Sequence, residues 1–333
     1  MDIKKIALFL LFVSLWGTPS IKAQERIIYN QYHFNYYLIN PAIAGAERGS
    51  HIMLTTKNNW LGLDDAPGTQ TASFYTRLKR GDAIGLGGYL FNDKNGQFRN
   101  IGGQVTFAYH IPMSDGRGQL IYTELDRQLS FGISAKMVAA GYEARPEITD
   151  DPANVSDFLY LPNANFGVYY SSYGFFTGFS ATNIIPIRSY PTKWSGNESL
   201  LAPFTGFLFL GYAIQVLDRN THLEPSCNYT MAIYKEQKKV QNTRQQLDLN
   251  LKFSQIFPQG NFGYWLQFSY RHNLDKGIGR SFSVVPMGGI RVGGFHVGYA
   301  FNWNLSKIAT ASNFGTHEAV ISYSFSPSRF FAR

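Results

Sequence analysis

Hydrophobic and polar residues alternate with a period of two along most of this chain. From Leu247 to Ser254, Leu or Phe occupies every odd position and Asp, Asn, Lys or Ser every even one. The segment 295–306 has large apolar residues on one phase and small or polar residues on the other. Successive side chains of a strand point to opposite faces, so this pattern predicts β-strands with one apolar and one polar face.

The predicted strands are numerous and long. About fourteen segments share the pattern, at residues 51–58, 69–79, 82–92, 97–111, 125–140, 162–171, 173–183, 203–216, 220–234, 241–255, 261–271, 279–290, 294–305 and 314–326. Strands of soluble proteins average about five or six residues, whereas a tilted strand that crosses a membrane needs roughly 9–11. Length and an even strand number therefore favour an all-β fold, a transmembrane antiparallel β-barrel of about 14 strands.

The connections between these segments are consistent with a barrel. If residue 51 starts at the periplasmic end, the predicted periplasmic turns are short, at 80–81, 172, 217–219, 256–260 and 291–293. The predicted external loops are mostly longer, at 141–161, 184–202, 235–240, 272–278 and 306–313. Bacterial barrels have short periplasmic turns and longer external loops. The connection 112–124 is the exception, because it is long and falls on the periplasmic side.

The N-terminus has the features of a secretory signal peptide over residues 1–23. Lys4 and Lys5 precede an apolar run from Ile6 to Trp16, which is about 16 Å long as a helix and too short to cross a core of about 30 Å. Ala23 is the expected last residue removed. We therefore expect a periplasmic N-terminal segment over 24–50 that leads into a barrel formed by 51–333, in the bacterial outer membrane.

Composition excludes several classes of protein. Aromatic residues make up 16% of the chain and charged residues only 16%, against an average near 25% for charged residues, so a disordered chain is excluded. The single cysteine, Cys227, supports neither a disulfide framework nor a Cys-based zinc site. The formal charge is +8, but no basic helix or nucleic-acid motif accompanies it. After the signal peptide no run of 18 apolar residues remains, so a helical membrane protein is excluded.

No motif predicts catalysis, a cofactor or a metal site, and we expect no enzyme activity. Gly85-Leu86-Gly87-Gly88 lies in a strand, where its glycines favour bending or close packing of neighbours. His317 and Glu318 are adjacent on a strand and point to opposite faces, so they cannot act together. The predicted lumenal charges either line a channel or form a stabilising network, and they are Lys136, Asp248, Lys252, Arg271 and Glu318.

Two regions of the sequence are more specific than generic strands. They contain Gln31, Asn40-Pro41-Ala42-Ile43-Ala44-Gly45, Asn59-Trp60-Leu61-Gly62, Ala66-Pro67-Gly68-Thr69, Asn92-Asp93, Gly96 and, near the end, Gly315-Thr316-His317-Glu318. These residues resemble the PorP/SprF family of the type IX secretion system of Bacteroidetes. Two positions depart from the family pattern: Ile43 stands where Tyr is usual, and Asp65 where Gly is usual.

These motif residues have physical roles that either barrel architecture or partner docking would explain. Pro41 keeps Asn40 out of a helical conformation, and Gly45 permits a tight turn before the first strand. Trp60, Gly62 and the Ala66-Pro67 pair are expected to shape the first external loop. The candidate docking residues are Gln31, Asn40, Pro41, Gly45, Trp60, Gly62, Ala66, Pro67, Thr69, Gly315, His317 and Glu318.

The resemblance implies an outer-membrane barrel that works with type IX secretion components. Family members are similar to accessory proteins needed for secretion or surface attachment of large gliding adhesins, which carry a C-terminal sorting domain. The expected partners are therefore such an adhesin, type IX components and outer-membrane lipids. The alternatives are a passive outer-membrane pore for small solutes, a membrane-barrel hydrolase and a soluble exported β-sandwich.

Overall fold

The computed structural model describes residues 30–47, 49–62, 65–78, 83–113, 127–143, 157–185, 203–216, 220–235, 241–257, 262–274, 282–305 and 315–325. The predicted signal peptide and its cleavage site lie outside these residues. The described residues form fifteen strands: β1 (Ser50–Asn58), β2 (Gly68–Arg77), β3 (Ile84–Asn95), β4 (Phe98–Pro112), β5 (Arg127–Tyr142), β6 (Asp157–Ser172), β7 (Phe175–Thr182), β8 (Phe204–Tyr212), β9 (Ile214–Gln215), β10 (Thr221–Lys235), β11 (Gln241–Ile256), β12 (Phe262–Asn273), β13 (Phe282–Val292), β14 (Phe295–Asn304) and β15 (Thr316–Ser324).

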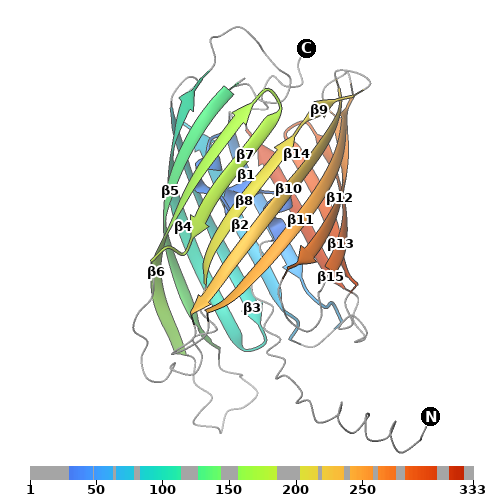
Figure 1. Cartoon of the computed structure of the whole chain (residues 1–333). Coiled ribbons are helices and arrows are strands. Elements are labelled where there is room, and N and C mark those ends of the chain that lie inside the picture. The colour runs from blue at the N-terminus through green and yellow to red at the C-terminus, as the bar shows by residue number, and fades with distance from the viewer. Residues whose placement is uncertain are drawn as a thin grey trace, which may run out of the picture.

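The strands form one closed antiparallel barrel (Figure 1). Each long strand pairs with its neighbours in sequence, and β1 pairs with β15 from His51↔Ser324 to Asn58↔His317, which joins the two ends of the sheet. The two-residue β9 continues the line of β8 along β10, so fourteen strands span the wall. The predicted fold is confirmed, and each of the fourteen predicted segments overlaps an observed strand.

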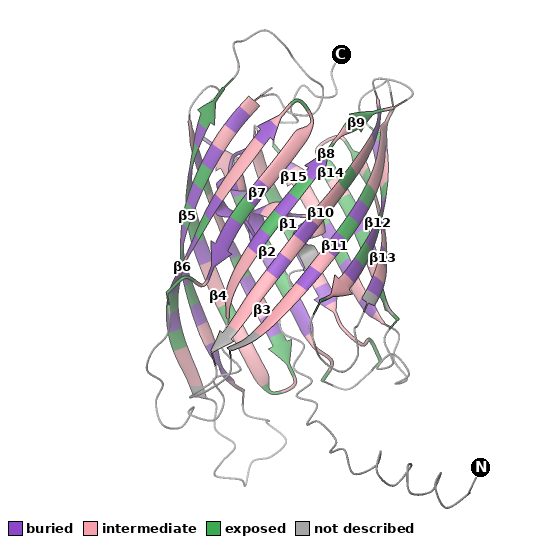
Figure 2. Cartoon of the chain, viewed as in Figure 1, coloured by how far each residue is buried: buried purple, intermediate pink, exposed green. Residues whose placement is uncertain are grey.

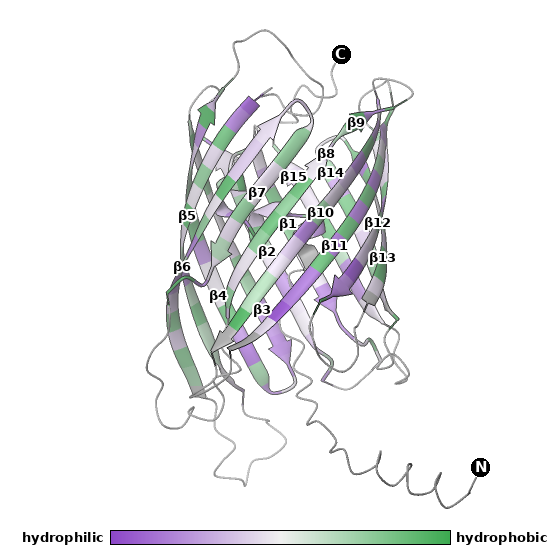
Figure 3. Ribbon diagram, viewed as in Figure 1, coloured by the Kyte–Doolittle hydropathy of each residue, from purple (hydrophilic) through white to green (hydrophobic). Residues whose placement is uncertain are grey.

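The two faces of the wall differ in polarity, as the alternation predicts. On β11, Leu249 and Leu251 point outward and are 49% and 48% exposed, whereas Asp248 and Asn250 point inward and are buried. The same stripes of exposed apolar and buried polar residues follow the other strands (Figures 2 and 3). A closed barrel satisfies every backbone hydrogen bond between strands while its apolar face meets lipid. Within the described ranges, no helix is both long and apolar enough to cross a bilayer.

The two ends of the barrel differ in the length of their connections. At one end, which we call the short-turn end, tight turns at 173–174 and 293–294 join β6 to β7 and β13 to β14. At the other, the long-loop end, the connections include 59–67, 143–156 and 183–203. The sequence predicts this alternation and one departure from it, the long connection between β4 and β5 at the short-turn end. The tight turn at 96–97, between β3 and β4 at the long-loop end, is a second departure.

Residues 30–46, which we call the plug, lie inside the barrel. They form three short 3-10 helices, η1 (Asn30–His33), η2 (Tyr36–Leu38) and η3 (Pro41–Ile43). The side chains of Tyr37 and Asn40 are completely buried, and Figure 1 shows this segment enclosed by the strands. The sequence predicts a periplasmic segment over 24–50, and the structure places residues 30–46 of it within the lumen.

Candidate functional site

The plug turns are fixed locally by two asparagines. The side-chain oxygen of Asn35 accepts a 3.1 Å hydrogen bond from the Tyr37 amide, and that of Asn40 accepts a 2.9 Å bond from the Ala42 amide. Such caps satisfy amides that lack partners in a first helical turn. Asn40 is extended, with φ −136° and ψ 111°, as the following proline predicts. Short capped turns therefore give this segment its shape without strand pairing.

The wall beneath the plug is lined with glycines on its inward face, and we call this wall surface the seat. A Cβ added to Gly85 would overlap the carbonyl of Ala44, and one added to Gly132 would overlap the backbone of Pro41 and Ala42. A Cβ at Gly167, on β6, would overlap the Asn40 side chain in the same way. Gly45 also approaches closely from the plug side, where an added Cβ would lie 2.8 Å from Gly85 Cα, and its φ of +76° favours glycine. Backbone of the plug therefore lies directly against backbone of the wall.

Side chains of the seat hold the plug by its backbone carbonyl groups. His110 Nε2 lies 3.0 Å from the Ala44 oxygen, Gln128 Nε2 donates to the Ala46 oxygen at 3.0 Å, and Ser180 Oγ donates to the Ile39 oxygen at 2.6 Å. The Asn40 amide in turn donates to the Val168 oxygen on β6 at 3.0 Å. The three wall side chains come from β4, β5 and β7, so several strands hold one short segment of the plug.

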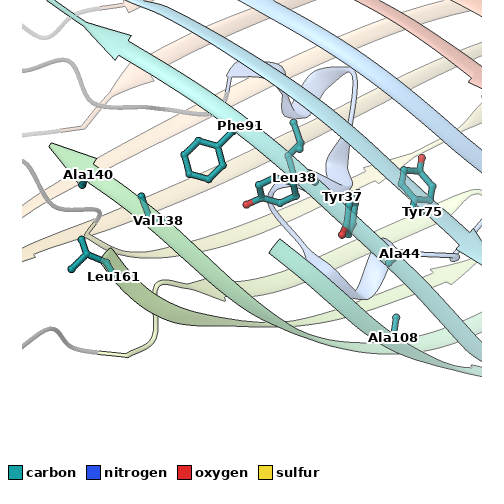
Figure 4. Packing of buried hydrophobic residues seen from close by; sticks show 10 residues of the cluster. Tyr37, Leu38, Ala44, Tyr75, Phe91, Ala108, Val138, Ala140 and Leu161 are labelled. Atoms are coloured by element: carbon teal, nitrogen blue, oxygen red, sulfur yellow. The ribbon is translucent and has the colours of Figure 1, made fainter. Parts of the chain in front are cut away.

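An apolar cluster packs the plug against the inward face of β2 to β6 (Figure 4). Its buried members are Tyr37, Leu38, Ala44, Tyr75, Tyr89, Phe91, Ala108, Val138, Ala140 and Leu161. The Tyr37 hydroxyl also donates to Thr106 Oγ1 at 2.8 Å. Burial of aromatic and aliphatic side chains stabilises the seated plug by the hydrophobic effect.

The first part of the plug binds the opposite wall through a charged group. The Tyr32 hydroxyl donates a 2.5 Å hydrogen bond to Asp248 Oδ2 on β11. Asp248 also accepts from Arg271 on β12, with Nε–Oδ1 and Nη2–Oδ2 both 2.9 Å. We call Tyr32, Asp248 and Arg271 the latch. Beside it, the Phe34 ring meets the Trp265 ring edge-on, with centroids 5.8 Å apart.

His33 is an uncharged member of this region. Gln267 Nε2 lies 3.1 Å from its Nδ1. Burial lowers the pKa of His33 to about 3; the Asp248 charge opposes this shift, whereas the Arg271 charge adds to it. The imidazole is therefore neutral near pH 7, and the latch carries only the mutually paired charges of Asp248 and Arg271.

Two of the other predicted lumenal charges, Lys136 and Lys252, are also engaged. Lys136 Nζ donates to Asn183 Oδ1 at 3.2 Å and lies 5.3 Å from the centre of the Phe91 ring. Lys252 lies over the Trp265 ring at 5.9 Å. Of the two hypotheses for these charges, the observed contacts favour a stabilising network.

The motif residues near the two ends of the chain meet at the long-loop end. Residues 59–62, 65–67 and 315–317, which we call the motif rim, lie where β1 ends and where β2 and β15 begin. Leu61 N donates to the Gly315 oxygen at 3.2 Å, and Thr316 Oγ1 donates to Asn59 Oδ1 at 3.2 Å. Trp60 has φ +51°, an uncommon conformation for a residue with a side chain. The rim therefore joins segments that are distant in sequence.

The candidate docking residues consequently separate into different places. Asn40, Pro41 and Gly45 belong to the plug, as does Gln31, which lies in η1. The rim contains Trp60, Gly62, Ala66, Pro67, Gly315 and His317. Thr69 and Glu318 lie inside the wall, where Thr69 Oγ1 donates to Asp93 Oδ1 at 2.6 Å. They therefore do not form one continuous surface.

His317 and Glu318 occupy opposite faces, as the sequence predicts. Glu318 is buried and faces inward, whereas His317 Nδ1 lies 2.5 Å from the Tyr299 hydroxyl on the outside. Cys227 also follows the predicted apolar face, since its neighbours across the sheet are Leu210 and Leu249. In the part of the chain that the structure describes, no cluster of three or more His, Cys, Asp or Glu side chains is placed to hold a metal ion.

The sequence does not identify the seat or the latch as a unit. Gly132 and Gly167 are conspicuous only once their strands are assigned, because both fall on the inward phase, where a polar side chain is expected. Tyr32 belongs to the motif region, but its partner Asp248 is 216 residues away. Inward-phase glycines on neighbouring strands are the signal from which an occupant of the lumen can be inferred.

Solved structures similar to this chain are bacterial membrane barrels. A deletion mutant of the monoaromatic hydrocarbon channel TodX matches with a TM-score of 0.50 and 9% identity, covering 86% of this chain and 92% of that one. The toluene transporter TodX of P. putida matches with a TM-score of 0.47 and 10% identity, covering 87% and 93%. The β domain of the Bordetella autotransporter BrkA gives 0.40 and 11%, covering 83% and 99%. The first of these matches shows a likeness of fold alone.

The family comparison covers most of the chain. No curated protein matches the sequence. The model of the family described as type IX secretion system membrane protein PorP/SprF matches residues 21–323. Together with the closed barrel and its apolar outer face, this match assigns an outer-membrane location. The chain therefore belongs to the PorP/SprF family of type IX secretion system membrane proteins.

Proposed function

We propose that this barrel is a non-enzymatic accessory of type IX secretion that assists secretion or surface attachment of a partner adhesin. The partner would be recognised through its C-terminal sorting domain. Family membership supports the secretion role. The observation that carries the choice between accessory and pore is the plug, which crosses the lumen from the seat on β3–β7 to the latch on β11 and β12. A passive pore for small solutes, the alternative, is expected to have an unobstructed lumen.

Contact through loops is favoured over strand addition. A peptide that adds to a sheet needs an unpaired strand edge, and here β1 and β15 are paired along eight positions from His51 to Asn58. The motif rim offers the better candidate surface. Leu61 is 45% exposed at this end of the barrel, and the neighbouring backbone is tied to Gly315.

The test compares two leucines at opposite ends of the barrel. Leu61→Asp places a charge on the motif rim, and Leu78→Asp places one at the short-turn end, where Leu78 is 49% exposed. Each full-length variant is purified in mild detergent from cells that express the adhesins, and the bound proteins are identified by mass spectrometry. We expect wild type and Leu78→Asp to retain an adhesin or type IX components, and Leu61→Asp to lose most of the adhesin.

Two results would count against this function. Recovery of the wild-type barrel alone would argue against any role in export, and equal adhesin recovery with all three proteins would remove the motif rim from the contact. A third measurement addresses the alternative. A steady, large conductance of the wild-type protein in planar bilayers, with normal adhesin secretion in cells lacking it, would favour the passive pore. Heat-modifiable migration on gels verifies that each variant is folded.

A further inference from the structure

The plug binds its two walls in different ways. Residues 37–46 contact the seat largely through backbone, with Ile39, Ala44 and Ala46 all accepting hydrogen bonds from wall side chains. The side chains of Tyr37 and Asn40 add bonds to Thr106 and Val168. Among the described hydrogen bonds, residues 32–34 reach the opposite wall through side chains alone, with Tyr32 bonded to Asp248 and His33 to Gln267. The Asn35 amide instead donates to Ser73 Oγ on β2, next to the seat, at 2.8 Å. The two halves therefore differ in how firmly they are held.

Shape reinforces this difference. At Gly85 and Gly132 of the seat any side chain would overlap plug backbone, and at Gly167 it would overlap the Asn40 side chain. On the other wall, Gly298 lies near the Phe34 ring, with 3.0 Å from an added Cβ to Phe34 Cε1. An aromatic ring can move away by rotation or with its short segment, whereas the interlocked backbone of the seat cannot move without disrupting several hydrogen bonds at once.

The charges of Asp248 and Arg271 also remain paired when Tyr32 leaves. Asp248 is bonded to Arg271 through both oxygens and to Gln246 Nε2 at 2.9 Å. Loss of the Tyr32 hydroxyl therefore removes one bond to a carboxylate that keeps its main partner. Leaving a buried charge unpaired is the costly event, and release of the latch avoids it.

From these contacts we propose that the plug is a hinged gate. Residues 30–34 detach from the wall formed by β8, β11, β12 and β14, while residues 35–46 remain in the seat. Detachment breaks the contacts of Tyr32 with Asp248 and of Phe34 with Trp265, and it opens the lumen on that side. It also removes Tyr32 from the buried apolar cluster that it forms with Ile39 and, on β8, Phe207 and Phe209. The seated half keeps the gate attached, so the opening is partial and reversible.

Two tyrosines provide a matched test of the gate. Tyr32→Phe removes the latch hydroxyl, and Tyr37→Phe removes a hydroxyl that bonds Thr106 in the seat. The full-length proteins are studied in planar bilayers without any partner protein. A hydrogen bond to a charged group contributes enough that its loss shifts a two-state equilibrium by about tenfold or more. We therefore expect Tyr32→Phe to raise the open probability about tenfold and Tyr37→Phe to leave it near the wild-type value.

Cysteine labelling reads the position of each half directly. In a Cys227→Ala background, single cysteines replace Phe34 or Ala42, and a membrane-impermeant maleimide is applied to the folded protein in detergent. We expect adding Tyr32→Phe to accelerate labelling at position 34 about tenfold and to leave position 42 protected. The folded state is verified by heat-modifiable gel migration.

Each of the other results overturns the gate. Equal open probabilities for Tyr32→Phe and Tyr37→Phe, or a wild-type protein that is permanently open, would show that the latch does not control the lumen. Equal labelling at positions 34 and 42, fast or slow, would show that the plug moves as one body or not at all. None of these results bears on adhesin binding, so the gate and the export function are tested separately.

Discussion

The hydroxyl of Tyr32 and the carboxylate of Asp248 lie 2.5 Å apart although 216 residues separate them in the chain. The contact joins the first described turn of the plug to the eleventh strand, across the lumen from the glycine seat. It depends on a second partner, since Arg271 holds Asp248 in place with two hydrogen bonds of 2.9 Å. A short N-terminal segment is thereby bound to both sides of the barrel.

The buried ion pair predicts strong coupling between its two residues. The side chains of Asp248 and Arg271 are 0% and 7% exposed, and removal of one partner leaves the other charge buried, at a cost of about 3–5 kcal/mol. We expect Asp248→Asn and Arg271→Gln each to lower the thermal unfolding midpoint in detergent, and the double variant to lose less than the sum. Additive losses in this double-mutant cycle would contradict the pairing.

The close contact between plug and seat predicts that a side chain added at an inward-facing glycine of the seat lowers the stability of the protein. Gly132→Ala places a methyl group against the backbone of Pro41 and Ala42, and such overpacking costs about 1–3 kcal/mol. Gly206→Ala is the control, because the nearest atom to its added Cβ, the Met231 oxygen, is 4.0 Å away. We expect only Gly132→Ala to lower the unfolding midpoint and to expose a cysteine at position 42 to maleimide. Equal midpoints would mean that the plug does not lie against Gly132.

Acid is predicted to release the latch half of the plug. The pKa of His33 is about 3 when the plug is seated, and a released histidine has a pKa near 6.5. The released state therefore binds the proton more tightly. Stability of the seated state is retained above about pH 6.5 and lost progressively as the pH falls towards 3, with a shift of roughly a hundredfold by about pH 4.5.

The measurement is the rate of labelling at Phe34→Cys as the pH is lowered, corrected for the reactivity of a free thiol. His33→Gln is the control, because it keeps a hydrogen-bond acceptor for Gln267 but does not titrate. The charged groups that face position 33, Asp248 and Arg271, are present in both proteins, so their contribution cancels. An identical pH dependence with histidine and glutamine would exclude His33 as the source.

The apolar outer face predicts that a charge placed on it lowers the stability of the barrel by an amount that depends on its depth in the bilayer. Ile133 lies near the middle of β5 and is 58% exposed, so Ile133→Arg places a charge close to the bilayer midplane. The expected loss is roughly 2–4 kcal/mol of barrel stability, against about 0–1 near an interface. Asn95→Arg, at the long-loop end of β3, is the matched control. The stability of each variant is measured by refolding into lipid vesicles over a series of urea concentrations. Equal stabilities of the two variants would mean that Ile133 does not face lipid.

Strand positions follow from the sequence because the lipid imposes a simple rule on the outer face. Every second residue must be apolar over a full membrane span, so segments such as 247–254 are recognisable without a partner strand. Pairing of neighbours in sequence then fixes the topology, since each strand is joined to the next by a connection at one end. The two-residue β9 is the one strand that this rule does not separate from its neighbour.

The plug does not follow from the sequence for a physical reason. Its 3-10 turns are too short to show a period, and its contacts to Thr106, Val168 and Asp248 are all distant in the chain. The sequence predicts a tight turn at Gly45 and an extended Asn40, and both are confirmed. Neither feature indicates on which side of the wall the segment lies. That information is carried by glycines such as Gly132, whose role is evident only from a contact 90 residues away in sequence.

The bond between Leu61 and Gly315 has a consequence for assembly. It lies just beyond the paired residues Asn58 and His317, at the junction where the first and last strands join. A barrel that has not yet joined these strands has no such bond, and the segments on either side are unconnected. The contacts that join the segments of the motif rim therefore form only in a closed barrel. A partner that recognises the joined rim would not bind chains that are truncated or still inserting into the membrane.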